Sequence, residues 1–227
     1  MLIMTVLGFP AYPLLAMLPS TRRAWRLVHG YGILHLDEKL GIPGHKVRAW
    51  LRSAGYGIGI GVLIVIITTI ISLIGEWSGI SSSSSSTTTT MAASALESLI
   101  YNNGNYRIQC FLLISCVMVI GPICEEFLFR GVIGMSLRDS GMFQNAGRRT
   151  RMALVCAISG MLFGIMHVQT SASIAVSVST VIQAGIIGAL FTWMAAYRFH
   201  SLVPSMFAHM TNNILTLIVI LSFGIGA

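Results

Sequence analysis

The sequence is poor in charged residues. Asp, Glu, Lys and Arg make up only 9% of its 227 residues, whereas 55% are hydrophobic and the mean hydropathy is +0.80. An ordinary soluble domain carries about 25% charged residues, and its core cannot absorb this much apolar surface. The composition therefore argues against a soluble globular protein and makes the lipid bilayer the expected solvent.

Cysteines are also few, and several common site patterns are missing. The chain has no C-x-x-C pair, no H-E-x-x-H pair and no evident internal repeat. Cys124 precedes two acidic residues, but it has no base at a spacing typical of a cysteine nucleophile. The four cysteines are therefore expected to be small packing residues. They are Cys110, Cys116, Cys124 and Cys156.

What the chain does contain is long apolar runs. About 20 apolar residues in a helix span the hydrocarbon layer of a bilayer. Six runs of this kind predict an all-α fold, a polytopic membrane helical bundle of about six transmembrane helices. They cover residues 1–19, 54–75, 110–136, 152–168, 172–197 and 202–225. The first is interrupted by Pro10 and Pro13 and has no basic segment that would make it a signal peptide.

Basic residues in the connections indicate the orientation of these spans. Residues 20–53 hold seven Lys or Arg, residues 137–151 hold four and the turn near 198–201 holds Arg198, whereas 76–109 hold one and 169–171 none. Because Lys and Arg favour the cytoplasmic side, this alternation places both termini outside. The net charge of +7 is thus a topology signal, and no nucleic-acid partner is expected.

A polar low-complexity run divides the chain. Six serines from Ser81 are followed by four threonines, a composition that cannot build a core and is typical of an external loop. The expected organisation is N-terminal spans with a basic cytoplasmic loop (1–80), a Ser/Thr-rich external loop (81–109) and a catalytic helical core (110–227). In the second span, four glycines at alternate positions give small-x-x-x-small spacings that favour close helix contact. These are Gly55, Gly57, Gly59 and Gly61.

Three ionisable residues lie inside the third predicted span. Such residues cost several kcal/mol in a membrane and are retained where they pair or act. Glu126 and Arg130 are four residues apart, so they are expected to share a helix face and pair. Glu125 then points about 100° away and is left for other partners. Alone, this pattern fits a structural ion pair and a catalytic acid equally well.

Further polar residues lie on two other spans. His167 ends the fourth span, and His209 and Asn213 share one face of the sixth, with Asn212 beside them. Each has a structural interpretation, since buried His and Asn residues also join membrane helices by hydrogen bonds. Together with the acids, however, they supply a base, imidazoles and an amide donor. These are the groups that water activation requires.

Three motifs in order resemble the CPBP family of intramembrane proteases. This family includes CAAX prenyl endopeptidases and bacteriocin-processing or immunity proteins and is also called the Abi family. The motifs are Glu125-Glu126-x-x-x-Arg130, Phe163-x-x-x-His167 and His209-x-x-x-Asn213, within the stretches CEEFLFRGVI and PSMFAHMTNNIL. The resemblance covers about residues 110–225 and implies an all-helical membrane endopeptidase.

The resemblance also implies roles for these residues. Glu125 would activate water with His167, His209 and Asn213 would stabilise the oxyanion, and Glu126 with Arg130 would hold Glu125 in place. Glu125, His167 and His209 could instead be the three protein ligands of an open divalent-metal site such as Zn²⁺. The sequence leaves both chemistries open.

Two other functions fit part of the sequence. A membrane scaffold or bacteriocin immunity protein could hold a peptide without cleaving it, although the intact motifs argue against this. A small transporter or proton relay would also retain buried Glu and His residues. The favoured interpretation is an endopeptidase of the cell membrane, expected to be the bacterial cytoplasmic membrane, whose partners are the bilayer and a membrane-associated CAAX-type, bacteriocin or leader peptide. Whether that substrate is prenylated stays open.

Overall fold

A computed structural model describes residues 46–77, 107–168 and 174–223 of the chain. All regular elements in these ranges are helical. They are α4 (Lys46–Trp77), α6 (Arg107–Ser115), η1 (Cys116–Ile120), α7 (Gly121–Glu126), η2 (Phe127–Gly134), α8 (Met135–Asp139), η3 (Gly141–Phe143), α9 (Arg148–Ile165), α10 (Ile174–Trp193), η4 (Met194–Arg198) and α11 (Val203–Phe223). The segments η1, η2 and η4 are π-helical, and η3 is a 3₁₀ turn.

Four helices in the described ranges are long and apolar enough to cross a membrane. They cover Arg48–Ile71, Gln109–Asp139, Ser177–Arg198 and Val203–Ser222. The predicted all-α membrane bundle is thereby confirmed, but the count of six is not. The first predicted span lies outside the described residues. The fourth predicted span corresponds to α9, which has too many charged residues to count among these membrane-spanning helices. Its first four residues include Arg148, Arg149 and Arg151.

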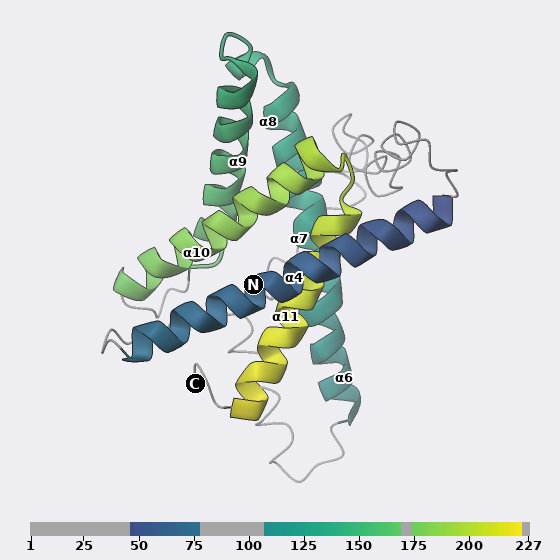
Figure 1. The fold of residues 1–227 in the computed structure, drawn as a ribbon, viewed down its shortest axis with the longest axis vertical. Coiled ribbons are helices and arrows are strands. Elements are labelled where there is room, and N and C mark those ends of the chain that lie inside the picture. The colour runs from purple at the N-terminus through teal and green to yellow at the C-terminus, as the bar shows by residue number, and fades with distance from the viewer. Residues whose placement is uncertain (1–45, 78–106, 169–173, 224–227) are drawn as a thin grey trace.

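The third span is one continuous rod built from α6, η1, α7, η2 and α8 (Figure 1). Pro122 explains the first wide turn, because proline has no N–H for the backbone ladder. Just before it, the Gly121 N–H bonds the Cys116 carbonyl five residues back instead of the Val117 carbonyl four residues back. Membrane helices tolerate proline where such π adjustments and neighbouring side chains satisfy the backbone.

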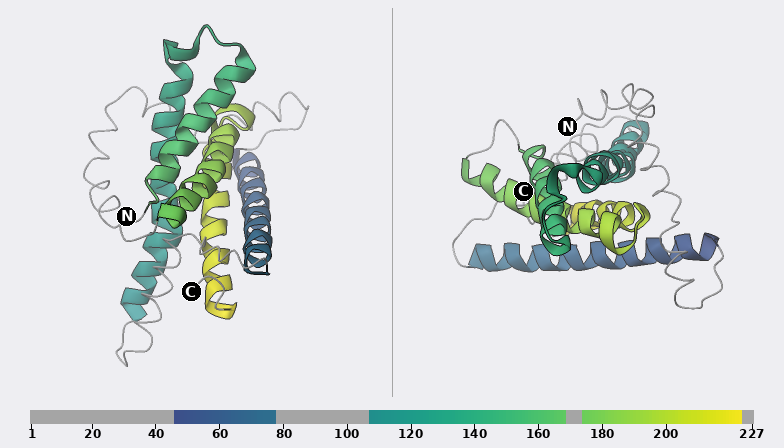
Figure 2. Two further views of the ribbon diagram at one scale, coloured as in Figure 1. Left: turned by 90° about the vertical axis from the view of Figure 1, so that its left-hand side faces the viewer. Right: turned by 90° about the horizontal axis from the view of Figure 1, so that it is seen from above.

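Glycines bring α4 against α11. A Cβ at Gly57 or Gly61 would collide with the backbone of Pro204 or Ala208, so the two helices touch at these points. Gly55 and Gly59 have no such neighbour. The predicted small-x-x-x-small contact therefore exists, on the face that holds Gly57 and Gly61. The two helices lie side by side in the left view of Figure 2.

The contacts also give the relative directions of the helices. Gly57 and then Gly61 meet residues in rising order along α11, so α4 and α11 run parallel. Gly160 meets Gly185 and Ala189, while Gly164 meets Val181, so α9 and α10 run antiparallel. These directions agree with spans that enter the membrane alternately from the two sides.

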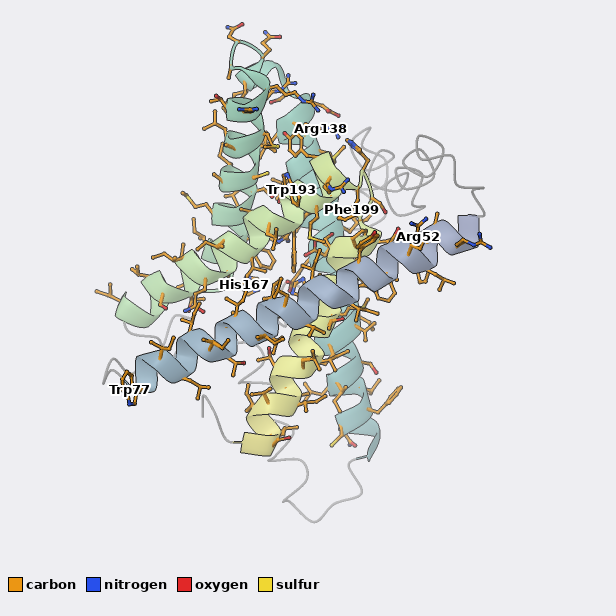
Figure 3. The ribbon with its side chains drawn as sticks, viewed as in Figure 1. Arg52, Trp77, Arg138, His167, Trp193 and Phe199 are labelled. Carbon is orange, nitrogen blue, oxygen red and sulfur yellow. The ribbon has the colours of Figure 1, made fainter. Side chains whose placement is uncertain are left out.

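Several basic residues lie at helix ends that the sequence assigns to the cytoplasmic side. Arg138, near the end of the third span, donates from Nη1 to the Ala196 carbonyl at the end of the fifth, 3.2 Å away. Arg52 lies toward the opposite end of α4 from Trp77 (Figure 3). These positions agree with the predicted basic cytoplasmic face.

Candidate active site

The two acids close the short helix α7, which is the α-helical turn between the π-helical segments η1 and η2. Their surroundings differ. Glu126 is completely buried, whereas the Glu125 side chain keeps 18% of its surface exposed. The two neighbouring acids thus differ in exposure, although the Oε2 atom of Glu125 is itself buried.

Glu126 lies against Arg130 and His209. Its Oε1 lies 3.1 Å from Nη1 of Arg130, as the spacing of four residues predicts, and Arg130 is equally buried. The same oxygen lies 3.0 Å from Nδ1 of His209 on α11. A buried carboxylate requires such compensation, because an unpaired charge in a dry interior is very costly. The Glu126–Arg130 pair thus holds the imidazole of His209, whose other nitrogen faces Glu125.

Aromatic rings surround the guanidinium of Arg130. Its Cζ lies 4.2 Å from the centroid of Phe163, 5.4 Å from that of Phe191 and 5.8 Å from that of Phe129. Ring faces attract a cation, most strongly where water is excluded. The rings of Phe163 and Phe191 also contact His209, with centroids 5.8 Å and 5.7 Å away. These rings therefore stabilise a charge that lipid alone would not tolerate.

Two imidazoles approach Glu125. Nε2 of His167 lies 3.7 Å from Oε2 of Glu125, and Nε2 of His209 lies 3.8 Å from the same oxygen. His167 comes from the turn that follows α9, and His209 comes from α11. The structure thus brings together acid and imidazole groups from three spans, as the family resemblance implies.

The other ring nitrogens indicate which tautomers are present. Nδ1 of His167 lies 2.8 Å from the Phe163 carbonyl, which can only accept a hydrogen bond. Nδ1 of His209 faces Glu126, whose ion pair with Arg130 keeps it a carboxylate acceptor. In its neutral form each imidazole therefore carries its proton on Nδ1. In these forms the two Nε2 atoms are acceptors and face Oε2 of Glu125, so three acceptors converge on one point.

Asn213 contacts the backbone of the third span. Its Nδ2 donates to the Val117 carbonyl, 3.4 Å away. That carbonyl has no usual helical partner, because the Gly121 N–H bonds Cys116 and Pro122 has no N–H. Asn213 thus satisfies the backbone that the proline disrupts. Its predicted role in binding an oxyanion stays a prediction.

The predicted metal ligands lie close together. Nε2 of His167 and Nε2 of His209 lie 3.7 Å and 3.8 Å from Oε2 of Glu125, and a metal ion with bonds of about 2.1 Å could still lie between such atoms. In the described ranges, no group of three or more His, Cys, Asp and Glu side chains is already arranged to hold a metal ion. Metal ligation by Glu125, His167 and His209 therefore stays a prediction.

Several residues of the site have no distinctive signal in the sequence. Phe191 packs on Arg130 and His209. The Ser159 hydroxyl donates to the Phe129 carbonyl of η2, and the Thr192 hydroxyl contacts that of Ser159. Phenylalanine, serine and threonine are common in apolar spans. The only hint is that Ser159 lies four residues before Phe163, on the same face of one helix.

A family model supplies independent evidence. The model described as type II CAAX prenyl endopeptidase Rce1-like matches residues 107–215. The match runs from the first residue of α6 into α11 and includes every polar residue described above. The match supports the resemblance of this region to the CPBP family of CAAX-type proteases, which the three motifs indicated. No curated protein and no solved structure matches the chain.

The family match and the apolar helices together indicate a multi-pass membrane protein similar to intramembrane proteases. The match leaves α4 outside its limits, although α4 packs against α11. The predicted division of the chain at residues 81–109 and its placement in a bacterial cytoplasmic membrane stay predictions. The chemistry of cleavage and the substrate likewise stay predictions.

Proposed function

We propose that the chain is an intramembrane endopeptidase in which Glu125 activates water directly. One observation carries the proposal: the Nε2 atoms of His167 and His209 converge on Oε2 of Glu125 at 3.7 Å and 3.8 Å. Three converging acceptors are complemented by a donor with more than one hydrogen, and a water molecule is such a donor. That water would lie where a base can take its proton.

The reaction balances with groups of this chain alone. Glu125 takes one proton from water, and the resulting hydroxide oxygen bonds to the carbonyl carbon of the peptide. The carbonyl oxygen becomes an oxyanion, for which the second amide hydrogen of Asn213 is the expected donor. The proton then passes to the peptide nitrogen, the C–N bond breaks, and a carboxylic acid and an amine form.

In this proposal Glu126 and Arg130 act on His209. A carboxylate that accepts from Nδ1 fixes the tautomer and orientation of an imidazole, as in hydrolases that use an Asp–His pair. Arg130 keeps Glu126 ionised in the dry interior, and the rings of Phe163 and Phe191 keep Arg130 in place. His167 receives its orientation from the Phe163 carbonyl.

The substrate that best fits the family match is a CAAX-type peptide with a prenyl chain in the bilayer. A bacteriocin or leader peptide is the alternative of the same reaction class. A scaffold or immunity protein that only binds peptides is the non-catalytic alternative. The choice of peptide distinguishes a CAAX-type substrate from a leader peptide. A variant without Glu125 distinguishes cleavage from binding alone.

The test is a cleavage assay with the purified protein in lipid vesicles. Two quenched fluorescent peptides serve as probes, a farnesylated CAAX-box peptide and an unprenylated leader-type peptide. The wild type is expected to cleave at least one of them, and Glu125→Gln neither. Asp139→Asn is the matched control, since it makes the same chemical change at the far end of the same rod, on an exposed residue paired with Arg138.

A chelator arm decides between direct and metal-assisted water activation. Cleavage that continues in 1,10-phenanthroline supports the direct route. Cleavage that stops and returns with added Zn²⁺ contradicts it and favours metal ligation by Glu125, His167 and His209.

A further inference from the structure

Two buried hydroxyls join the fourth and fifth spans to the rod that carries the acids. Ser159 Oγ on α9 donates to the Phe129 carbonyl, 3.2 Å away. Thr192 Oγ1 on α10 lies 2.9 Å from Ser159 Oγ and 2.9 Å from the Gly188 carbonyl of its own helix, so its single hydrogen is shared between these two acceptors. Ser159 and Thr192 are both 0% exposed. These two side chains are called the hydroxyl clamp below.

The hydroxyl clamp holds the peptide group between Phe129 and Arg130. The Phe129 carbonyl belongs to the same planar peptide as the N–H of Arg130, so fixing the carbonyl fixes the backbone from which the Arg130 side chain extends. This peptide lies within η2, a wide π-helical turn of the kind that often marks functional sites. Gly134 leaves room for the clamp, because a Cβ there would lie 3.3 Å from Thr192 Cγ2 and 3.2 Å from the Phe129 carbonyl oxygen.

The same two helices also hold the other end of Arg130. Phe163 lies one turn after Ser159 on α9, and Phe191 immediately precedes Thr192 on α10. Both rings face the guanidinium. Each helix therefore contributes one hydroxyl on the backbone side of Arg130 and one ring on its charged end.

We propose that Ser159 and Thr192 are positioning residues, whose hydroxyls set the place of Arg130 and, through Glu126, the orientation of His209. The inference rests on the proposed peptidase function for its catalytic consequence. Its structural consequence, a fixed His209 imidazole, does not depend on that function. A simple role in joining helices would affect stability alone, so the two can be separated.

The kinetic test uses the farnesylated CAAX-box peptide in vesicles. Ser159→Ala and Thr192→Val are expected to lower kcat on the order of 10-fold or more with KM unchanged, because small misplacements of reacting groups are expensive in rate. Thr192→Ser, which keeps the hydroxyl, is expected to restore kcat. The double variant Ser159→Ala/Thr192→Val is expected to match Ser159→Ala, since Thr192 acts through Ser159.

Ser53→Ala is the matched control. Ser53 is another fully buried serine, but its hydroxyl donates to the Ala49 carbonyl of its own helix, 2.8 Å away. Its kcat is expected to equal that of the wild type.

A second readout does not need activity. The ¹⁵N–¹H signal of His209 Nδ1, assigned with His209→Asn, is expected to move or broaden in Ser159→Ala and in Thr192→Val, and to stay in place in Ser53→Ala and Thr192→Ser. If the wild type cleaves neither peptide, the proposed function fails and this signal alone decides on the clamp. An unchanged signal in Ser159→Ala, or a lowered melting temperature with normal kcat, overturns the inference. A Thr192→Ser variant as impaired as Thr192→Val overturns it as well.

Discussion

His209 bridges the two acids of the site. Its Nδ1 lies 3.0 Å from Oε1 of the buried Glu126, and its Nε2 lies 3.8 Å from Oε2 of the more exposed Glu125. Adjacent residues of one helix turn therefore contact opposite ends of one imidazole on another span. This relationship separates a structural acid from a reacting acid, and the first two predictions follow from it.

Replacing Glu126 is expected to destabilise the protein. Glu126→Gln leaves Arg130 completely buried without its counterion, and breaking a buried ion pair costs about 3–5 kcal/mol. The measurement is denaturant or thermal unfolding in detergent. Asp139→Asn removes a partly exposed pair with Arg138 and is expected to cost less than about 1 kcal/mol. Equal stability of Glu126→Gln and the wild type would contradict the structural role of the pair.

The two nitrogens of His209 can be tested separately. Asn at position 209 places an amide N–H near the position of Nδ1 but has no group at Nε2. His209→Asn is therefore expected to fold normally and to lose activity by roughly 10²-fold, because the attacking water loses one of the acceptors that hold it in place. His209→Gln drops the contact with Glu126 and is expected to lose stability as well. Near-normal cleavage by His209→Asn would remove Nε2 from the mechanism.

The rings around Arg130 are expected to differ in strength. Phe163 lies 4.2 Å from the guanidinium carbon and Phe191 lies 5.4 Å from it. Desolvated cation–π contacts contribute about 2 kcal/mol and weaken with distance. Phe163→Leu should therefore reduce the free energy of unfolding by about 1 kcal/mol more than Phe191→Leu. Equal losses would mean that packing, and not the cation–π contact, dominates.

The contact between α9 and α10 is expected to reject larger side chains. A Cβ at Gly160 would collide with the Gly185 carbonyl, whereas a Cβ at Gly59 on α4 would meet nothing. Gly160→Val should lower stability by about 1–3 kcal/mol, as overpacking does. Gly59→Val is the control and should leave the melting temperature unchanged. A tolerated Gly160→Val would show that this helix pair is looser than described.

Much of the architecture could be predicted from local patterns. Runs of apolar residues indicate where spans lie, and a spacing of four residues correctly predicts the ion pair of Glu126 with Arg130 and the face that holds Gly57 and Gly61. These features depend on the period of a helix, which the sequence displays directly. The convergence of three spans was expected from the order of the family motifs.

Other features depend on contacts between distant parts of the chain. Pro122 removes an N–H, but whether the helix kinks, breaks or widens depends on the donors nearby, among them Asn213. The end of α9 at Ile165 places His167 in a turn rather than on a helix, and no strong stop signal precedes it. Ser159 and Thr192 likewise gain their significance only once α9, α10 and η2 are packed together.

The central claim is that Glu125 is the base that activates water for peptide cleavage. The most direct measurement is kcat/KM of Glu125→Gln on the cleaved peptide, with its melting temperature measured on the same sample. The account predicts a loss of roughly 10²–10⁴-fold without a change in melting temperature, since Glu125 belongs to no buried ion pair comparable to that of Glu126. Wild-type kcat/KM in a folded Glu125→Gln protein would contradict it.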